Sequence, residues 1–188
     1  MNAKIDMVPG GDRRRILRGA VLCLAGMATP GTAAADSISV MAEQDLRFGT
    51  LVVPFSGTRT VGVNGSIDDS RVMSLGGAPA GPARFTITYD RESGSNRPLN
   101  ILVQVYINGG QSLSDGGVTG RLSRLETDLP GSAGLLSGSV ATFTIEGCRE
   151  RRCSRTFRVG ARLQVDRSQG GAQLAFALPV SAAILAVY

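Results

Sequence analysis

Hydrophobic and polar residues alternate with a period of two through most of the chain after residue 36, which is typical of β-strands that turn one face to a core. The clearest segment is 157–165, where Phe157 and Val159 fall on one side and Arg158 falls on the other. Residues typical of turns separate the alternating segments. The pattern also predicts strands at residues 37–41, 46–53, 58–63, 83–89, 99–107, 118–125 and 140–145, and an apolar terminal segment at 173–188.

About seven to nine short strands joined by turns predict an all-β fold, and we expect an antiparallel β-sandwich. Asn64-Gly65 predicts a tight hairpin turn after the strand at 58–63. Residues 71–82 are rich in Gly, Ala and Pro and predict a loop. The 25 Gly and 8 Pro among 188 residues agree with a fold that needs many turns. We therefore expect one sandwich domain over residues 36–188.

The first 35 residues follow another pattern, with a basic stretch at 13–18, an apolar run at 20–28 and small residues up to Ala35. This order predicts a cleavable signal peptide at residues 1–35, because the apolar run is well short of the roughly 20 residues that span a bilayer. A short buried helix behind a basic tail is the alternative, and Met7 is an alternative start. Both the general secretory and the twin-arginine routes stay open. We expect an exported protein in the periplasm, at the cell surface or outside the cell, with no membrane span after cleavage.

Removing the predicted signal peptide lowers the charge of the chain. The whole chain has 20 Lys and Arg against 15 Asp and Glu, which gives a formal charge of +5. The first 35 residues hold five of the cationic and two of the acidic residues, so a charge of +2 remains. A nearly balanced chain offers no concentrated cationic face to phosphates, and we expect no nucleic-acid partner.

Missing residue types limit the catalytic chemistry that the chain can perform. It has no His, and its single lysine, Lys4, belongs to the predicted signal peptide. Ser-His-Asp, Cys-His and Ser-Lys mechanisms each need one of these side chains as a base, so the sequence excludes them. Asp68, Asp69 and Asp115 fit solvated turn residues better than a calcium site, because no complete ligand spacing accompanies them. We expect no enzymatic activity, no cofactor and no metal.

Two cysteines remain after the signal peptide, Cys148 and Cys153, and they predict a disulfide formed in an oxidising compartment. Closing so short a loop stabilises a fold by about 2 kcal/mol. Zinc is the alternative, but two thiols without an imidazole make a poor zinc site. The disulfide would create a stiff basic loop at a hairpin tip. Its arginines are candidate contacts for an anionic polymer or for lipid headgroups, with a solvated tip as the simpler interpretation: Arg149, Arg151, Arg152 and Arg155.

The end of the chain is apolar and uncharged from residue 180 to residue 188. Such a strand needs a partner, and pilin-like domains exchange such strands between chains. The alternative is a last core strand of its own domain. The residues that would enter a partner in an exchange alternate along the segment: Val180, Ala182, Ile184, Ala186 and Tyr188.

Three groups of residues occur in an order that resembles a known family: Leu46-Arg-Phe-Gly-Thr-Leu51, Ala83-Arg-Phe-Thr-Ile-Thr88, and Phe157-Arg-Val-Gly-Ala-Arg-Leu-Gln-Val165 followed by 174–188. The chain is similar to the uncharacterised bacterial family called domain of unknown function 4402. The resemblance implies an exported immunoglobulin-like or pilin-like β-sandwich, and it carries over no catalytic residue. Gly160-Ala161 departs from the family's usual glycine pair, and the loop between the cysteines is an addition.

These observations predict an exported, non-enzymatic structural or adhesive surface protein, such as a subunit of a pilus-like assembly or of a coat. Its partners would be further copies of itself, or a periplasmic chaperone and usher. The alternative is a monomeric periplasmic binding module for an anionic surface polymer or a carbohydrate.

Overall fold

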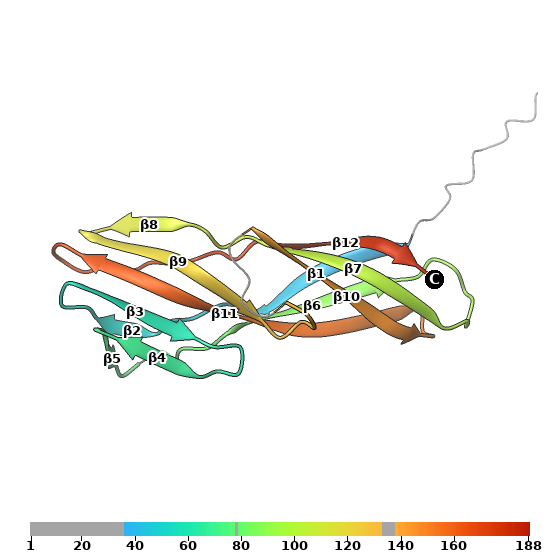
Figure 1. Cartoon of the computed structure of the whole chain (residues 1–188), viewed down its shortest axis with the longest axis horizontal. Helices are drawn as coiled ribbons and strands as arrows, with labels where there is room; N and C mark the ends of the chain where they lie inside the picture. The colour runs from blue at the N-terminus through green and yellow to red at the C-terminus, as the bar shows by residue number, and fades with distance from the viewer. Residues whose placement is uncertain (1–35, 78, 133–137) are drawn as a thin grey trace, which may run out of the picture. The chain divides into compact units, whose positions relative to one another are not determined.

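The computed structural model describes residues 36–77, 79–132 and 138–188, so the predicted signal peptide lies outside the described residues. Within these ranges the chain forms twelve strands and no helix, and every strand pair is antiparallel (Figure 1). The all-β sandwich that the period-two pattern predicts is confirmed. The described ranges hold no helix with the length and hydropathy needed to cross a membrane.

The larger sheet has seven strands arranged around β11 (Arg152–Arg167), a strand of 16 residues. The first half of β11 pairs with β6 (Ala83–Asp90), which pairs in turn with β1 (Ser37–Gln44). The second half of β11 lies between β3 (Ser56–Val61) and β9 (Val118–Thr127). Because two sets of partners follow each other along β11, this strand joins both halves of the sheet.

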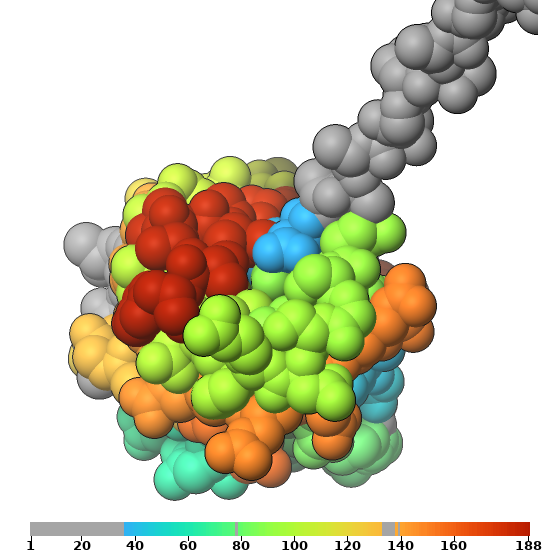
Figure 2. Space-filling view, turned by 90° about the vertical axis from the view of Figure 1, so that its right-hand side faces the viewer, coloured from blue at the N-terminus to red at the C-terminus, as the bar shows by residue number. Residues whose placement is uncertain are grey.

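The smaller sheet has three strands in the order β10 (Ser139–Cys148), β7 (Leu99–Ile107) and β12 (Val180–Val187). It lies over the half of the larger sheet that contains β1 and β6 (Figure 1). Residues 101, 103 and 105 of β7 are fully buried and belong to one core with the inward residues of β6 and β11. The edge strands β1 and β12 contact each other, and Figure 2 shows them side by side.

Three short strands were not predicted. They carry no buried side chain and so lack the alternation that reveals a strand in a sequence: β4 (Ile67–Ser70), β5 (Met73–Leu75) and β8 (Ser112–Asp115). A fourth short strand, β2 (Thr50–Val52), lies within the predicted strand at 46–53. β5 lies within residues 71–82, so the prediction of a loop there is wrong in part. The predicted strand at 46–53 is wrong for its first four residues. Gly49 takes a φ of 70°, and Arg47 makes only an isolated bridge with Gly81.

The predicted hairpin turn at Asn64-Gly65 is confirmed and connects β3 to β4. Gly65 has a φ of 84°, a conformation that favours glycine. The side chain of Asn64 supports the turn, because its Oδ1 accepts the backbone N–H of Ser66 at 2.9 Å.

Candidate functional site

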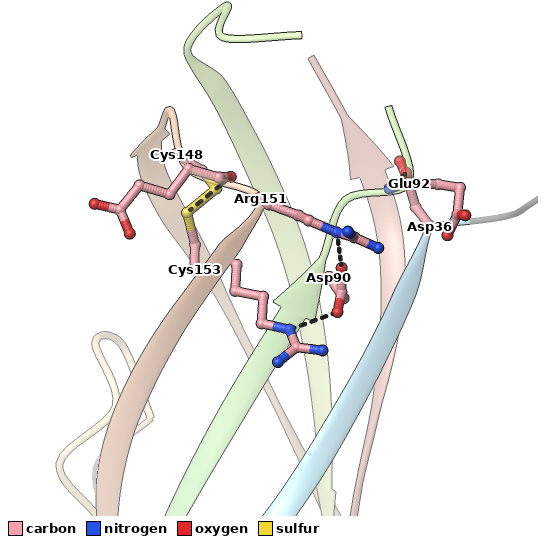
Figure 3. Close-up of polar contacts among 8 residues, drawn as sticks. Asp36, Asp90, Glu92, Cys148, Arg151 and Cys153 are labelled. Atoms are coloured by element: carbon pink, nitrogen blue, oxygen red, sulfur yellow. Dashed lines mark hydrogen bonds and ion pairs between the residues drawn. A yellow bond between two sulfur atoms is a disulfide. The ribbon is translucent and has the colours of Figure 1, made fainter. Parts of the chain in front are cut away.

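The disulfide loop connects the two layers of the sandwich. Cys148 is the last residue of β10, Cys153 is the second residue of β11, and their sulfur atoms are bonded with the Cα atoms 5.9 Å apart (Figure 3). The expected disulfide is thus present. The expected hairpin tip is wrong, because β10 belongs to the smaller sheet and β11 to the larger one. The bond therefore holds one sheet to the other.

Two of the four candidate arginines of this loop are engaged within the chain. Arg152 is the ladder partner of Asp90, and its Nε donates to Asp90 Oδ2 at 2.6 Å. Arg151 Nε lies 3.4 Å from Asp90 Oδ1 on the other side (Figure 3). The hydrogen bond from Arg152 is the main cause that holds the pKa of Asp90 below its usual range. One carboxylate therefore interacts with two exposed guanidinium groups.

The other two candidates, Arg149 and Arg155, are exposed, and neither side chain has a hydrogen-bond or ion-pair partner among the described residues. Glu150 lies between them in the sequence and is also exposed. The loop is therefore a surface of mixed charge. Contact with an anionic polymer stays a prediction for these residues.

A buried tyrosine holds the start of β1 beside the loop. Tyr89 is fully buried, and its hydroxyl donates to Asp36 Oδ2 at 2.7 Å. The backbone N–H of Glu92 donates to Asp36 Oδ1 at 3.2 Å, and Figure 3 shows these two residues next to each other. Burial first, and then the hydrogen bond to Asp36, raise the pKa of Tyr89 to about 12. These bonds hold Asp36, the residue before β1, to Tyr89 near the end of β6 and to the loop that follows β6.

The terminal segment pairs with its own chain. β12 forms a ladder with β7, and Val180, Ala182 and Ile184 pack against the core. A bulge between Ile184 and Ala186 shifts the register, so the alternation expected up to Tyr188 does not keep one face. Strand exchange between chains stays a prediction, whereas within one chain β12 completes the smaller sheet.

The central part of the outer face of the smaller sheet has no charged side chain; Glu146, near the end of β10, is the one charged residue in its three strands. We name this central part the uncharged face, and register and alternation place on it Leu102, Gln104, Tyr106, Val140, Thr142, Thr144, Ser181 and Ala183. Tyr106 is 43% exposed and Val140 is 42% exposed. Beside Tyr106, where Pro179 leads into β12, lies a hollow of about 430 Å³. The outer face of the larger sheet differs, because it carries Arg84, Arg124, Arg158 and Arg162.

A family model for a domain of unknown function, DUF4402, matches residues 38–180. The chain belongs to the DUF4402 family. No curated protein and no solved structure matches it. The matched range covers both sheets of the sandwich, from β1 to the first residue of β12.

The phenylalanines of the sequence motifs pack in pairs in this DUF4402 domain. The rings of Phe48 and Phe176 meet edge to face with centroids 6.3 Å apart. Those of Phe85 and Phe157, ladder partners on β6 and β11, stack with centroids 5.6 Å apart. Such pairs add to the stability that burial gives. These motif residues therefore mark the core of the domain.

Sequence reasoning missed a buried ion pair. Arg59 on β3 donates from Nε and Nη2 to the two carboxylate oxygens of Asp69 on β4 at 2.6 and 2.5 Å, and from Nη1 to the carbonyl of Phe48 at 2.7 Å. Side-chain hydrogen bonding from Arg59 is the main cause that holds the pKa of Asp69 below its usual range. The prediction that Asp69 is a solvated turn residue is therefore wrong. Asp69 is a strand residue that forms an ion pair with Arg59. Residues 57, 59 and 61 of β3 all face the core. The position of Arg59 between Gly57 and Val61 in this alternation is the sequence signal that could have indicated its burial.

A second buried arginine closes the loop after β6. Arg91 is 3% exposed and donates to the carbonyls of Ser95 and Arg97, while its Nε lacks a partner among the described residues. In the whole part of the chain that the structure describes, no three or more His, Cys, Asp or Glu side chains are grouped so that they could hold a metal ion.

Proposed function

We propose that this protein is an exported, non-enzymatic surface protein that assembles with further copies of itself through the uncharged face, in the manner of a pilin-like or coat subunit. The observation that carries the proposal is the uncharged face, with Tyr106 and Val140 exposed beside a hollow. An antiparallel sheet with one solvated face normally places polar and charged residues there, as the larger sheet does. Exposed apolar area of this kind favours contact with another protein.

A second copy of the chain is the occupant that fits best. Two uncharged faces meet without repulsion and without burying an unpaired charge, which is the main penalty at an interface. The neighbouring β10 edge has no ladder partner other than β7 among the described strands, and its ten residues include one charge, Glu146. A strand edge of this kind is open to pairing. Because β12 already completes its own sheet, contact between finished domains is favoured over exchange of residues 180–188.

Export and the absence of catalysis are supported by sequence and chemistry together. The disulfide between Cys148 and Cys153 fits an oxidising compartment. The chain contains no His, and both of its cysteines after residue 36 are oxidised, so neither an imidazole nor a free thiol is offered there as a base or nucleophile. The alternative, a binding module for an anionic polymer at the disulfide loop, is weaker because Asp90 already interacts with Arg151 and Arg152.

Sedimentation of the purified exported protein over a range of concentrations tests the proposal. We expect the wild type to assemble as concentration rises and Tyr106→Arg to stay monomeric, because the new charge would be buried between two faces. Gln164→Arg is the matched control, since it adds the same charge to an exposed position on the larger sheet. A wild type that is monomeric throughout, or equal effects of both substitutions, would contradict the proposal.

A further inference from the structure

The outer face of the larger sheet holds two arginines side by side. Arg84 on β6 and Arg158 on β11 are direct ladder partners, and Gln44 on β1 is the partner of Arg84 on its other side. Direct partners on one face have Cβ atoms about 5 Å apart, and like charges at such positions destabilise a sheet. Within the described residues, neither guanidinium group makes an ion pair or a hydrogen bond. The pair is therefore a local concentration of positive charge.

These three side chains line a hollow of about 170 Å³. Pro82 and the turn residues Asn64 and Gly65 form its other walls, where the end of β3 meets the start of β6 beside β11. Asn64 Oδ1 already accepts a hydrogen bond from the turn, which leaves the amide NH₂ group as a donor. Every polar side chain in these walls can donate, and no carboxylate lines the hollow.

Two carboxylates in the neighbourhood are engaged elsewhere. Glu43 accepts a hydrogen bond from the hydroxyl of Thr86, and Asp128 Oδ1 accepts one from the backbone N–H of Arg158 at 2.7 Å. Neither belongs to the walls of the hollow. The charge of the two guanidinium groups is thus left for a ligand.

We propose that this hollow binds one tetrahedral oxyanion, the phosphate or sulfate group of a ligand. Guanidinium groups are planar forks that bind such oxygens with two hydrogen bonds each, and an anion between them turns their repulsion into attraction. The site lies on the larger sheet and the uncharged face on the smaller one. Each can therefore fail in experiment without the other.

A second arginine pair on the same face supplies a matched control. Arg162 on β11 is the ladder partner of Arg124 on β9, so it has a like-charged neighbour as Arg158 does. Arg124 Nε, however, lies 3.6 Å from a carboxylate oxygen of Glu126, and neither Arg124 nor Arg162 lines the hollow. Arg162→Gln removes one exposed charge from the same strand without touching the proposed site.

The test is a titration of the purified exported protein with inorganic phosphate and with sulfate at constant ionic strength, with chloride as the reference anion. Side-chain Nε–H signals of arginine are followed by NMR, and Tm is followed in parallel. We expect saturable shifts of the Arg84 and Arg158 signals and a higher Tm with the oxyanions, since a ligand of the native state stabilises it. Arg84→Gln and Arg158→Gln should weaken binding by about tenfold each and remove the rise in Tm, whereas Arg162→Gln should keep both.

Dimethyl phosphate distinguishes the two sources of such a group. Binding as strong as that of inorganic phosphate indicates a phosphodiester within a polymer, and clearly weaker binding indicates a free or terminal phosphate; both results support the site. An equal loss of oxyanion affinity in Arg162→Gln, or the same NMR shifts on addition of chloride, would overturn the proposed site. If a variant does not fold, the wild-type titration alone tests the site: saturable shifts of the Arg84 and Arg158 signals with phosphate or sulfate support it, and their absence contradicts it.

Discussion

At the scale of single residues, a buried charge matters more to this fold than the exposed charges do. The side chain of Arg59 is 2% exposed and that of its partner Asp69 is 28% exposed. Their bonds connect β3, β4 and the carbonyl of Phe48. The inward phase of Arg59 is visible in the sequence, but its partner depends on the register of β4. The residues of β4 are all exposed and carry no pattern that predicts that register.

Asp69→Asn is therefore expected to lower the free energy of unfolding by about 3 kcal/mol at neutral pH, because it leaves the guanidinium of Arg59 buried without a counter-charge. Urea denaturation measures the change. Asp68→Asn is the control: Asp68 is exposed, and its change should stay within about 0.5 kcal/mol. Equal effects of the two substitutions would contradict the role given to the ion pair.

The same pair predicts a dependence of stability on pH. The pKa of Asp69 is lowered in the folded state. Its carboxylate therefore contributes fully to stability above the unfolded-state pKa of about 4, and this contribution is lost as the pH falls through the folded-state pKa. The difference in unfolding free energy between wild type and Asp69→Asn should narrow between about pH 5 and pH 2. A difference that stays constant over this range would show that the carboxylate charge is not the cause.

At the scale of elements, the strands buried on one face were predictable and the others were not. β6 and β7 lie within one residue of their predicted ranges, because their inward residues alternate without a break. β11 begins five residues before its predicted start at 157, since Arg152 to Thr156 pair with β6 while their side chains stay largely exposed. Burial produces the periodic signal, and strand pairing alone does not.

Gly160 shows why a particular residue stands at the centre of β11. A Cβ atom there would lie 2.4 Å from the carbonyl oxygen of Val61 and 2.8 Å from the backbone nitrogen of Val63. Backbone atoms cannot move aside as a flexible side chain can, so Gly160→Ala should cost about 2–3 kcal/mol in thermal or urea unfolding. Gly94→Ala is the matched control, because its Cβ would meet open space. If Gly160→Ala left the free energy of unfolding unchanged, β3 and β11 would not be packed this closely.

The disulfide acts at this scale because it ties the end of β10 to the start of β11. Replacing Cys148 and Cys153 together by Ala should lower the free energy of unfolding by about 2 kcal/mol and leave the β-sheet circular dichroism spectrum unchanged. The modest value follows from the short loop that the bond closes. Loss of the folded spectrum at 25 °C would mean that the link between the sheets supports the fold far more than loop closure explains.

At the scale of the whole molecule, the two sheets present different surfaces. The larger sheet carries arginines on its outer face, and the smaller one carries none between its strand ends. The sequence predicted the all-β class, the disulfide and the family, but it did not predict the uncharged face. That face combines β7, β10 and β12, three segments far apart in the chain, and only the pairing of strands brings them together. The proposed oxyanion hollow escaped prediction for the same reason, because it combines residues of β1, β6, β11 and a turn.

Hydrogen–deuterium exchange of the exported protein, compared between dilute and concentrated samples, tests the central claim that the molecule works through the uncharged face. The account predicts that backbone amides in β7, β10 and β12 gain protection at high concentration. Those in β3, β9 and β11 should exchange at the same rate in dilute and concentrated samples. Unchanged exchange in all strands, or added protection confined to the larger sheet, would contradict it.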